Sequence, residues 1–560
     1  MSIGRFARTV WELDPRQVWG RAGFRARRAL WPAVDALPHV PFRLPALARR
    51  NVLPATCPLE DADLALLREG VLALSGHESA LPVGPPYEPE ETDPLYRYQL
   101  HEHGWLREAM TRAPDLRPRL RAWLEGYVSA RFERRSVARD PYPLATRIRE
   151  RQALVQLGLA APERFAQSFA DDARQLVGLS ETHLLANHLL RDRAALVSGS
   201  AWVGGVWGRP LRARALAMFA AECRAQFGGD GMHEERCPSY HAHALGDVLF
   251  ALEAAESFEP SGERDRWCEA LRACAERALG ALEVVTHADD LVAAFGDSAP
   301  RSTPRTSSFA RWADALGLRS AAPAPEAAGA HRRSTLPGAG FSKVAGARYD
   351  AFVTHGPFGA PAQPGHAHCD LFAFEMDVSG QRVVVDPGVH AYHDPDARLE
   401  TRRTRAHATP TLEGPQHSEQ AEIWSRFRCG WRPRSIEAMW HADSLVCEAR
   451  AFGPHHVRTL RRTFRFSPHQ LCISDEVEGA SDISAAIPLA PGLTAAPSPG
   501  GAVVRDAAGR HVLEVWASGG VGLRIERAQV SHRFGARTPA QRLRLRGPGR
   551  VEYTLVAAPP

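Results

Sequence analysis

Apolar residues recur at three- and four-residue steps from about 64 to 318, in stretches rich in Ala, Leu, Arg and Glu that short Gly and Pro breaks separate. This spacing places apolar side chains on one face of an α-helix. In 180–197, three leucines share one face and Asn187 lies on the other. Such helices suit a layered or toroidal array, in which inner helices pack outward and present polar residues to a central cleft.

The pattern changes after 319–338, an Ala-, Pro- and Gly-rich run without a sustained period that is predicted to be a linker. Residues 371–378 then alternate as a half-buried strand requires, and Ser379 and Gly380 form a turn that leads to a returning strand. Many short strands without intervening helices predict an antiparallel β-sandwich. The later strands are expected at 471–477, 503–506, 511–516 and 551–556.

These patterns predict an α+β chain of several domains. Residues 1–60 are expected to form a basic arm with short helices, and 61–318 a toroid of helical hairpins. The linker, 319–338, is followed by the β-sandwich at 339–560. A chain of 560 residues is long enough for two large domains.

The charge balance excludes one class of partner. The 69 basic and 64 acidic residues leave a net charge of +5, which is too weak over so large a surface to indicate nucleic-acid binding. Lys343 is the only lysine, so almost every cation is an arginine. Planar guanidinium groups bind carboxylate, sulfate or phosphate through two parallel hydrogen bonds, which favours acidic ligands.

The cysteines and the N-terminal residues indicate the cellular compartment in which the protein is expected. The nine cysteines are odd in number and form no CxxC, so neither a complete disulfide framework nor a zinc ribbon is indicated. The arginine-rich start lacks the apolar core of a secretory signal, and no stretch is long and apolar enough to predict a transmembrane segment. We therefore expect a cytoplasmic protein. The arm is expected to be a solvated helix, with contact to a membrane surface as the alternative.

Histidines cluster with aspartates in the strand-rich half. The strings GHAHCD at 365–370, VDPG at 385–388 and AHAT at 406–409 would bring two imidazoles and a carboxylate together. Two imidazoles and one carboxylate can bind zinc and leave a fourth position for water. The alternative is a hydrogen-bonded histidine network in a chain with 24 histidines. The three candidate ligands are His368, Asp386 and His407.

A second candidate lies in the helical half, at 226–240. Glycines end one helix there, and Pro238 stands where the first turn of the next helix tolerates proline. Tyr240 and His241 are therefore a candidate acid/base pair on a loop at the rim of the helices. A core tyrosine with a bonded hydroxyl is the alternative. Asn187 and His188 are expected in the middle of a helix, and by themselves they are weak evidence for a functional site.

Together these strings resemble the heparinase II/III-like polysaccharide lyases, whose relatives include oligoalginate lyases. The resemblance runs from about 95 to 479 and depends on the order and spacing of the strings. It implies an (α/α) toroid followed by an antiparallel β-sandwich, in agreement with the periodicity. The strings are LYRYQLHEHGWL at 95–106, DPYPLATRIRE at 140–150, HLLANHLL at 183–190, QFGGDGMHEERCPSYH at 226–241, HADDLVAAFGDS at 287–298, PGHAHCDLFAFEMDVSGQRVVVDPG at 364–388, RRTRAHATPTLEGPQHSEQ at 402–420 and HHVRTLRRTFRF at 455–466.

The resemblance implies β-elimination at a uronic acid. The proton on C5 is removed and the oxygen on C4 is expelled, which leaves a C4–C5 double bond. Because negative charge builds up beside the sugar carboxylate, that carboxylate must be neutralised, a role that falls on Asn187 with His188 beside it. Tyr240 would be the base, the acid to the leaving oxygen, or both in turn, and needs its pKa lowered to act as a base. His366 would be the other proton-transfer residue, entering the cleft from the sandwich.

The resemblance also implies a zinc ion on His368, Asp386 and His407, which would hold sandwich loops against the cleft. Many relatives have His-Asn-Thr where this chain has His407, Ala408 and Thr409, so an amide near the expected metal is missing. Zinc is the expected cofactor, with another divalent cation as the alternative.

Three further residues are candidates for supporting roles. Glu234 lies in the loop of Tyr240 and would orient it, with helix capping as the alternative. Arg147 and Arg403 are candidates for contacts with substrate carboxylate or sulfate, although arginines are more often solvated surface residues.

The expected function is therefore a lyase that acts on an acidic polysaccharide or oligosaccharide, as a monomer or a homodimer. Two alternatives remain: a non-catalytic glycan-binding or assembly protein with the same fold, and a zinc-dependent glycan hydrolase or deacetylase that uses the histidine cluster. The lyase requires Asn187, Tyr240 and His366 to meet in one cleft, flanking the same sugar ring.

Overall fold

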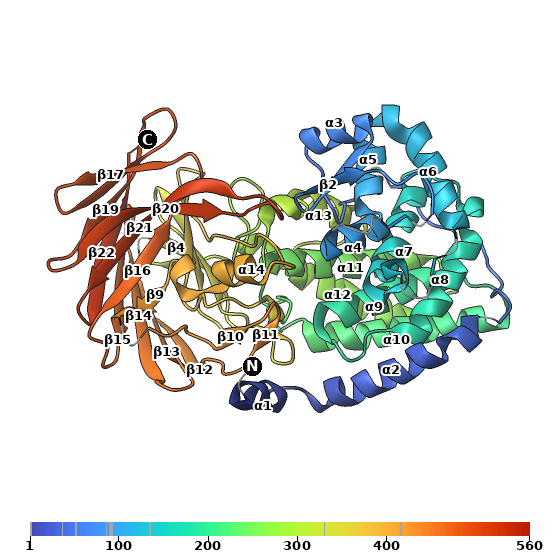
Figure 1. The fold of residues 1–560 in the computed structure, drawn as a ribbon, viewed down its shortest axis with the longest axis horizontal. Helices are drawn as coiled ribbons and strands as arrows, with labels where there is room; N and C mark the ends of the chain where they lie inside the picture. Colours follow the sequence, from blue (N-terminus) through green and yellow to red (C-terminus); the bar gives the residue numbers. More distant parts are fainter. Residues whose placement is uncertain are drawn as a thin grey trace.

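The structure is a computed structural model that describes residues 3–559 except 36, 51–52, 86, 89–92, 131, 134–135, 330 and 415–416. A helical half and a strand-rich half lie side by side along the long axis (Figure 1). The helix α14 (Pro395–Arg402) lies where the two halves meet. Among the described residues, no helix is both long and apolar enough to cross a membrane.

The helical half is the (α/α) toroid. Its innermost helices, α7, α9 and α11, are buried on nearly all sides, and α9 packs against α7, α8, α10 and α11. This confirms the prediction of a helical array with inner and outer members. The helices are α3 (Asp61–Glu69), α4 (Pro94–Glu102), α5 (Gly104–Arg112), α6 (Arg117–Ser129), α7 (Pro141–Gln156), α8 (Ala166–Leu179), α9 (Ala186–Ser200), α10 (Gly205–Gln226), α11 (Pro238–Glu256), α12 (Gly262–Val284) and α13 (Thr306–Ala315).

The helix predicted across 180–197 is wrong. Helix α8 ends at Leu179 and α9 begins at Ala186, because Leu185 and Ala186 have φ of 60° and 47°. With ψ of −157°, Leu185 lies in a region that normally only glycine occupies, at a cost of about 1–3 kcal/mol. Asn187 therefore lies in the first turn of α9 and not in the middle of a helix.

A hairpin of β1 (Val71–Leu74) and β2 (His77–Ala80) interrupts the helices and was not predicted. Its turn packs directly on the other half of the molecule. A Cβ added to Gly76 would lie 2.5 Å from the carbonyl oxygen of Gly535, so only glycine allows this approach.

The strand-rich half is the antiparallel β-sandwich, and its sheets share one apolar core. Its strands are β3 (Glu326–Ala328), β4 (His331–Leu336), β5 (Phe341–Ala345), β6 (Tyr349–Thr354), β7 (Phe374–Val378), β8 (Gln381–Val384), β9 (Pro410–Leu412), β10 (Ile423–Trp424), β11 (Arg428–Cys429), β12 (Arg434–Trp440), β13 (Ser444–Ala451), β14 (Arg458–Phe466), β15 (Gln470–Val477), β16 (Ile483–Pro488), β17 (Thr494–Ser498), β18 (Gly501–Arg505), β19 (His511–Ala517), β20 (Gly522–Val530), β21 (Thr538–Gly547) and β22 (Arg550–Ala557). The sheets have the orders β12-β13-β14-β15-β22-β19-β18-β17, β20-β21-β16-β9 and β3-β4-β5-β6-β7-β8, and β10 pairs with β11.

The boundary between the halves differs from the prediction in two ways. The expected linker, 319–338, contains β3 and β4, which pair with the sheet that β5 continues. Strand β7 is buried on both faces and not on one, because the toroid covers its second face. His287, which follows α12, lies between Glu375 and Asp377 of β7 at 2.5 and 2.7 Å. The turn at 379–380 and the hairpin that it closes are as predicted.

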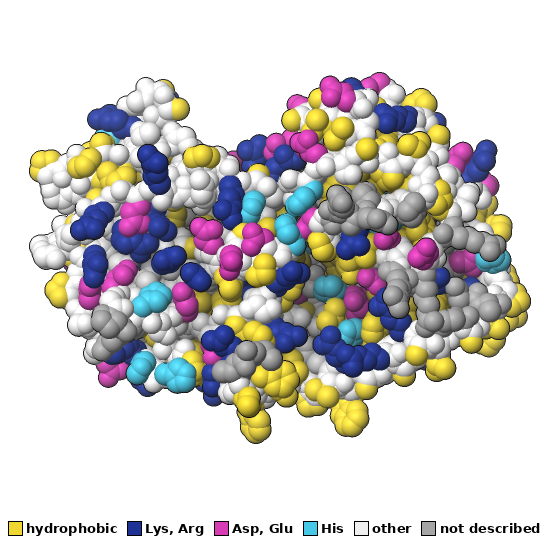
Figure 2. All heavy atoms as spheres, viewed as in Figure 1, with side chains coloured by type: hydrophobic (Ala, Val, Ile, Leu, Met, Phe, Trp, Pro, Cys, Tyr) yellow, Lys and Arg dark blue, Asp and Glu magenta, His cyan; other side chains and the backbone are white. Residues whose placement is uncertain are grey.

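The basic arm contains α1 (Ile3–Trp11) and α2 (Pro15–Asp35), of which α2 is longer than predicted. These helices run along the outside of the molecule from the sandwich to the toroid (Figure 1). Arg8 forms an ion pair with Glu422 of the sandwich, and α2 packs against α8. Hydrophobic side chains protrude along this edge in Figure 2; Trp11 and Trp19 are 87% and 77% exposed.

Candidate active site

Glu235 joins residues from both halves of the molecule. It belongs to the loop between α10 and α11, and its side chain is buried. One carboxylate oxygen accepts the backbone N–H of Asn187 at 2.9 Å, and the other lies 2.6 Å from Nδ1 of His366. His366 ends a short turn of the sandwich half, at Pro364–His366. The predicted meeting of Asn187 and His366 at the domain boundary therefore occurs, through a carboxylate that was not predicted.

Tyr240 completes this group from the first turn of α11. Its ring stacks on the His366 ring with centroids 3.9 Å apart and planes 16° apart. Its hydroxyl hydrogen-bonds the hydroxyl of Tyr392 at 2.9 Å. The expectation that Tyr240 and His366 flank a sugar ring is wrong for this structure, because stacked rings leave no space between them.

Burial and charge set the protonation of this group. Burial alone would raise the pKa of Glu235, but the charge and hydrogen bond of His366 outweigh it and lower that pKa. Glu235 is thus an ionised acceptor that faces Nδ1 of His366, so a neutral His366 would carry its N–H on Nδ1 and its lone pair on Nε2. Burial raises the pKa of Tyr240 well above its ordinary value, and Tyr392 and Asp297 raise it further. Tyr240 is therefore a proton donor at neutral pH.

Asn187 and His188 differ in their surroundings. Asn187 is buried, and its side-chain oxygen has no hydrogen-bond partner among the described atoms. His188 is half-buried, and its Nδ1 lies 2.8 Å from a carboxylate oxygen of Glu181. Burial opposes its protonation, but Glu181 outweighs burial and raises the pKa of His188. The first turn of α9 thus offers a free amide beside a histidine that is readily charged.

Asp297 and Arg398 also lie in this region, and no role was predicted for either from the sequence. Asp297 lies 2.7 Å from Nε2 of His368 and pairs with Arg398, whose Nη2 donates to it at 2.6 Å. The Arg398 guanidinium also lies over the Tyr392 ring, 5.0 Å from its centroid. Asp297 stands in one of the strings that carry the resemblance, whereas Arg398 lies in a short helix with no distinguishing pattern.

The three predicted metal ligands do lie together. His368, Asp386 and His407 are buried, and one candidate ligand atom from each lies within 4.8 Å of the others. His368 Nδ1 and His407 Nε2 have no hydrogen-bond partner among the described atoms. Asp297 holds the other nitrogen of His368, and Asp386 lies 2.6 Å from Nδ1 of His407. Two unpartnered imidazole nitrogens beside a carboxylate fit a zinc ion, and Asp297 gives His368 the outer carboxylate partner that ligand histidines usually have.

The remaining candidates lie elsewhere. The carboxylate that contacts His366 is that of Glu235 and not of Glu234, whose pKa burial and Glu235 raise to about 7. Arg147 is buried in the toroid, where it donates to the Ala138 carbonyl at 3.0 Å and not to the Glu235 group. Arg403 is exposed and lines a groove of about 400 Å³ whose lining includes none of the residues around Glu235.

Comparison with known proteins identifies the second half. Residues 328–557 match the family described as Heparinase II/III-like, C-terminal. The strand-rich half is thus similar to the C-terminal domain of heparinase II/III-like proteins. No curated protein sequence matches the chain. The resemblance inferred from the sequence is thereby confirmed for this half, and the matched residues include His366 and all three candidate metal ligands.

Solved structures extend the likeness to the heparinase-like toroid. A heparinase III structure has a TM-score of 0.68 at 15% identity, with 98% of this chain and 94% of that chain covered. A second heparinase III has a TM-score of 0.59 at 17% identity, covering 96% of this chain and 89% of that chain. A mutant of heparan sulfate lyase HepC from Pedobacter heparinus has a TM-score of 0.58 at 17% identity, covering 97% and 89%. At these identities the likeness establishes the fold of toroid plus sandwich.

Proposed function

We propose that this heparinase-like chain is a polysaccharide lyase that cleaves uronic-acid-containing glycans by β-elimination. The observation that carries the proposal is the bridge of Glu235 between Asn187 and His366, beside the Tyr240 hydroxyl. The bridge supplies one proton acceptor, one proton donor and one free amide at a boundary between two domains. The likeness to heparinase III and to a heparan sulfate lyase supports an acidic polysaccharide as substrate.

In this proposal His366 is the base. Glu235 holds the Nδ1–H, so the Nε2 lone pair is free to take the proton from C5 of the uronate. The negative charge of Glu235 stabilises the imidazolium that forms, as a carboxylate does behind other catalytic histidines. A residue placed by the sandwich thus acts under the control of one placed by the toroid.

Tyr240 is the acid. Its raised pKa keeps the phenol protonated, so it can give its proton to the oxygen that leaves C4. The hydroxyl now bonded to Tyr392 would instead meet that oxygen, because a glycosidic oxygen can replace the Tyr392 hydroxyl as acceptor.

The first turn of α9 binds the sugar carboxylate. The Asn187 side chain is unpartnered on its oxygen and supplies N–H donors that reorient toward a carboxylate. His188, whose pKa Glu181 raises, supplies positive charge as the enolate-like intermediate forms. A zinc ion held by His368, Asp386 and His407 would fix sandwich loops against the cleft when bound.

The test is product chemistry. Glycans that contain glucuronic, iduronic, mannuronic or guluronic acid are supplied to the full chain, and absorbance from a new C4–C5 double bond is followed. We expect a rise with at least one of them, and a loss of about 10²–10⁴-fold in rate in Tyr240→Phe. Tyr349→Phe is the matched control, because Tyr349 bonds backbone carbonyls in the sandwich. Saturated products, or binding without any turnover, would contradict the proposal.

A further inference from the structure

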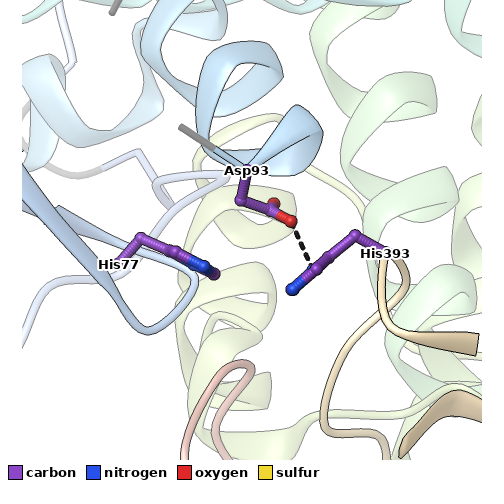
Figure 3. Close-up of side chains that lie close together, drawn as sticks. All are labelled: His77, Asp93 and His393. Carbon is purple, nitrogen blue, oxygen red and sulfur yellow. Dashed lines mark ion pairs between the residues drawn. The ribbon is translucent and has the colours of Figure 1, made fainter. Parts of the chain in front are cut away.

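A second cluster of possible metal ligands lies outside the candidate active site. It consists of His77, Asp93 and His393, and one ligand atom of each lies within 4.8 Å of the others. His77 begins β2, Asp93 precedes α4, and His393 belongs to the sandwich half. Figure 3 shows the three side chains pointing toward one another from these separate segments.

Each side chain is held in an orientation that suits a ligand. His77 Nδ1 lies 3.2 Å from the Ser75 carbonyl, to which it donates, so Nε2 is the ring nitrogen left for a metal ion. One Asp93 oxygen accepts the N–H groups of Leu95 and Tyr96 at 2.7 and 3.1 Å and caps α4. The other Asp93 oxygen forms an ion pair with Nδ1 of His393. Second contacts of this kind fix the ring and carboxylate orientations in metal sites.

The surrounding backbone holds the three segments together. The turn at Gly76 packs against Gly535, as described above. The N–H of Gly535 donates to the carbonyl of His390 at 2.8 Å, and Phe534 packs on Tyr392 with centroids 4.7 Å apart. The same loop therefore positions both the hairpin of His77 and the segment of His393, so the cluster is built from a fixed framework.

We propose that His77, Asp93 and His393 bind a divalent cation of the zinc type. Two neutral imidazoles and a carboxylate are the ligands that zinc accepts, with water in the fourth position. The Asp93 side chain is 1% exposed and that of His393 is 35% exposed, so the carboxylate is desolvated while the cluster stays open to an entering ion. Ligand atoms around a tetrahedral zinc ion lie about 3.3 Å apart, which rotation of the half-buried imidazoles can achieve.

An ion pair between Asp93 and His393 is the competing interpretation. It accounts for two of the three residues and leaves the role of His77 unexplained. The centroids of the His77 and His393 rings lie 5.2 Å apart with their planes at 70°, so His77 lies directly beside the pair. A shared cation would give all three side chains one common partner.

The expected consequence is a cross-link between the two halves. His77 and Asp93 belong to the toroid half, whereas His393 follows Tyr392, whose hydroxyl bonds Tyr240. A cation that binds only the folded chain stabilises it, by an amount that rises with the logarithm of the free cation concentration above the Kd. This inference does not depend on the proposed lyase activity, because it concerns metal binding alone.

Zinc stoichiometry tests the site. The full chain is stripped with a chelator and titrated with Zn²⁺ by calorimetry, in the wild type and in His77→Ala and His393→Ala. Each variant is expected to bind one Zn²⁺ fewer per chain than the wild type, because His368, Asp386 and His407 are unchanged. His455→Ala is the matched control, since His455 is exposed on the sandwich, and it should bind as the wild type does. Equal stoichiometry in the wild type and both variants would overturn the proposal.

A second variant guards against misfolding and gives a positive signal. In His77→Cys, a thiolate replaces the imidazole, and added Co²⁺ should produce the intense near-ultraviolet band of a cobalt–thiolate bond. The band should be absent from the wild type and from His77→Cys combined with His393→Ala. If the double variant gives the same band as His77→Cys, His393 is not a ligand and the site is refuted. Circular dichroism of each variant establishes that it is folded.

Discussion

At the scale of single residues, the candidate site depends on which of two adjacent glutamates faces the sandwich. The sequence places Glu234 and Glu235 one position apart in the same loop, and nothing in the pattern separates them. The choice follows from the path of the loop, where Arg236 has φ of 52°. Tyr240, His366 and Asn187 could be predicted because each stands in a distinctive string, whereas the carboxylate that joins two of them could not.

Replacing each glutamate separately tests this assignment. Glu235→Gln keeps the shape but removes the charge behind His366, and should lower kcat/KM by about 10²–10⁴-fold. Glu234→Gln, with a side chain that is not bonded to His366, should change it by no more than a few-fold. Steady-state rates of double-bond formation measure both. Equal losses in the two variants would show that the loop, and not the Glu235 charge, matters.

Single residues also explain why the predicted helix over 180–197 fails. Periodicity detects which positions are apolar, but Leu185 is buried in a backbone conformation that breaks the helix immediately before Asn187. Such conformations are imposed by tertiary packing, and they concentrate at functional sites. The leucine pattern was therefore real, but it continued across the non-helical segment between α8 and α9.

At the scale of elements, the toroid and β7 are joined by a buried histidine between two carboxylates. Although burial raises the pKa of Glu375, the hydrogen bond and charge of His287 lower it to about 2. Burial and Arg382 lower the pKa of His287, but Asp377 and Glu375 outweigh them and raise it. The alternation in 371–378 predicted the strand correctly, yet it could not reveal that the second face would be covered by a loop from the other half.

Removing this histidine should weaken the junction. His287→Gln removes the imidazolium between two buried carboxylates and leaves Glu375 only Arg382 at 3.7 Å, which costs about 3–5 kcal/mol of unfolding free energy. The lowered pKa of Glu375 contributes stability above its ordinary 4.5, and that stability is lost as pH falls toward 2. The raised pKa of His287 contributes stability below its ordinary 6.5, which is lost at higher pH.

The difference between wild type and His287→Gln should therefore be largest between pH 4.5 and 6.5. Urea unfolding of both proteins at pH 3, 5.5 and 9 measures it. A difference that stays constant across these three conditions would exclude titration of this triad as its source. His441→Gln, at an exposed position of the sandwich, provides the comparison for a histidine outside the junction.

At the scale of the whole molecule, the arm links the two halves along the outside of the molecule (Figure 1). The Glu422 carboxylate forms ion pairs with Arg8 and Arg5, with N–O distances of 2.6 and 3.3 Å. The indole N–H of Trp424 donates to the Thr9 hydroxyl at 3.0 Å. The composition predicted a basic arm, but it could not show that the first arginines of the arm would form ion pairs with a glutamate of the sandwich. Positions that are distant in sequence meet here, and local patterns carry no information about such pairings.

Loss of Glu422 should release the start of the arm. In Glu422→Ala, trypsin should cleave after the arginines of α1 and α2 several-fold faster than in the wild type, because the ion pairs with Arg5 and Arg8 are gone. Glu448→Ala removes an exposed pair with Arg461 and should leave the rate unchanged. Mass spectrometry of timed digests identifies the cut sites. Unchanged cleavage in Glu422→Ala would show that the other contacts, such as Trp424 with Thr9 and α2 with α8, are enough to retain the arm.

The contact between Tyr240 and His366 has one more consequence. The stacked rings must separate or tilt before a sugar ring can bind between them. The free energy of that rearrangement lowers the affinity for every ligand. A disaccharide has few other contacts with which to offset such a cost. The same factor applies at every chain length, so a disaccharide should show no detectable binding at concentrations where a hexasaccharide still binds.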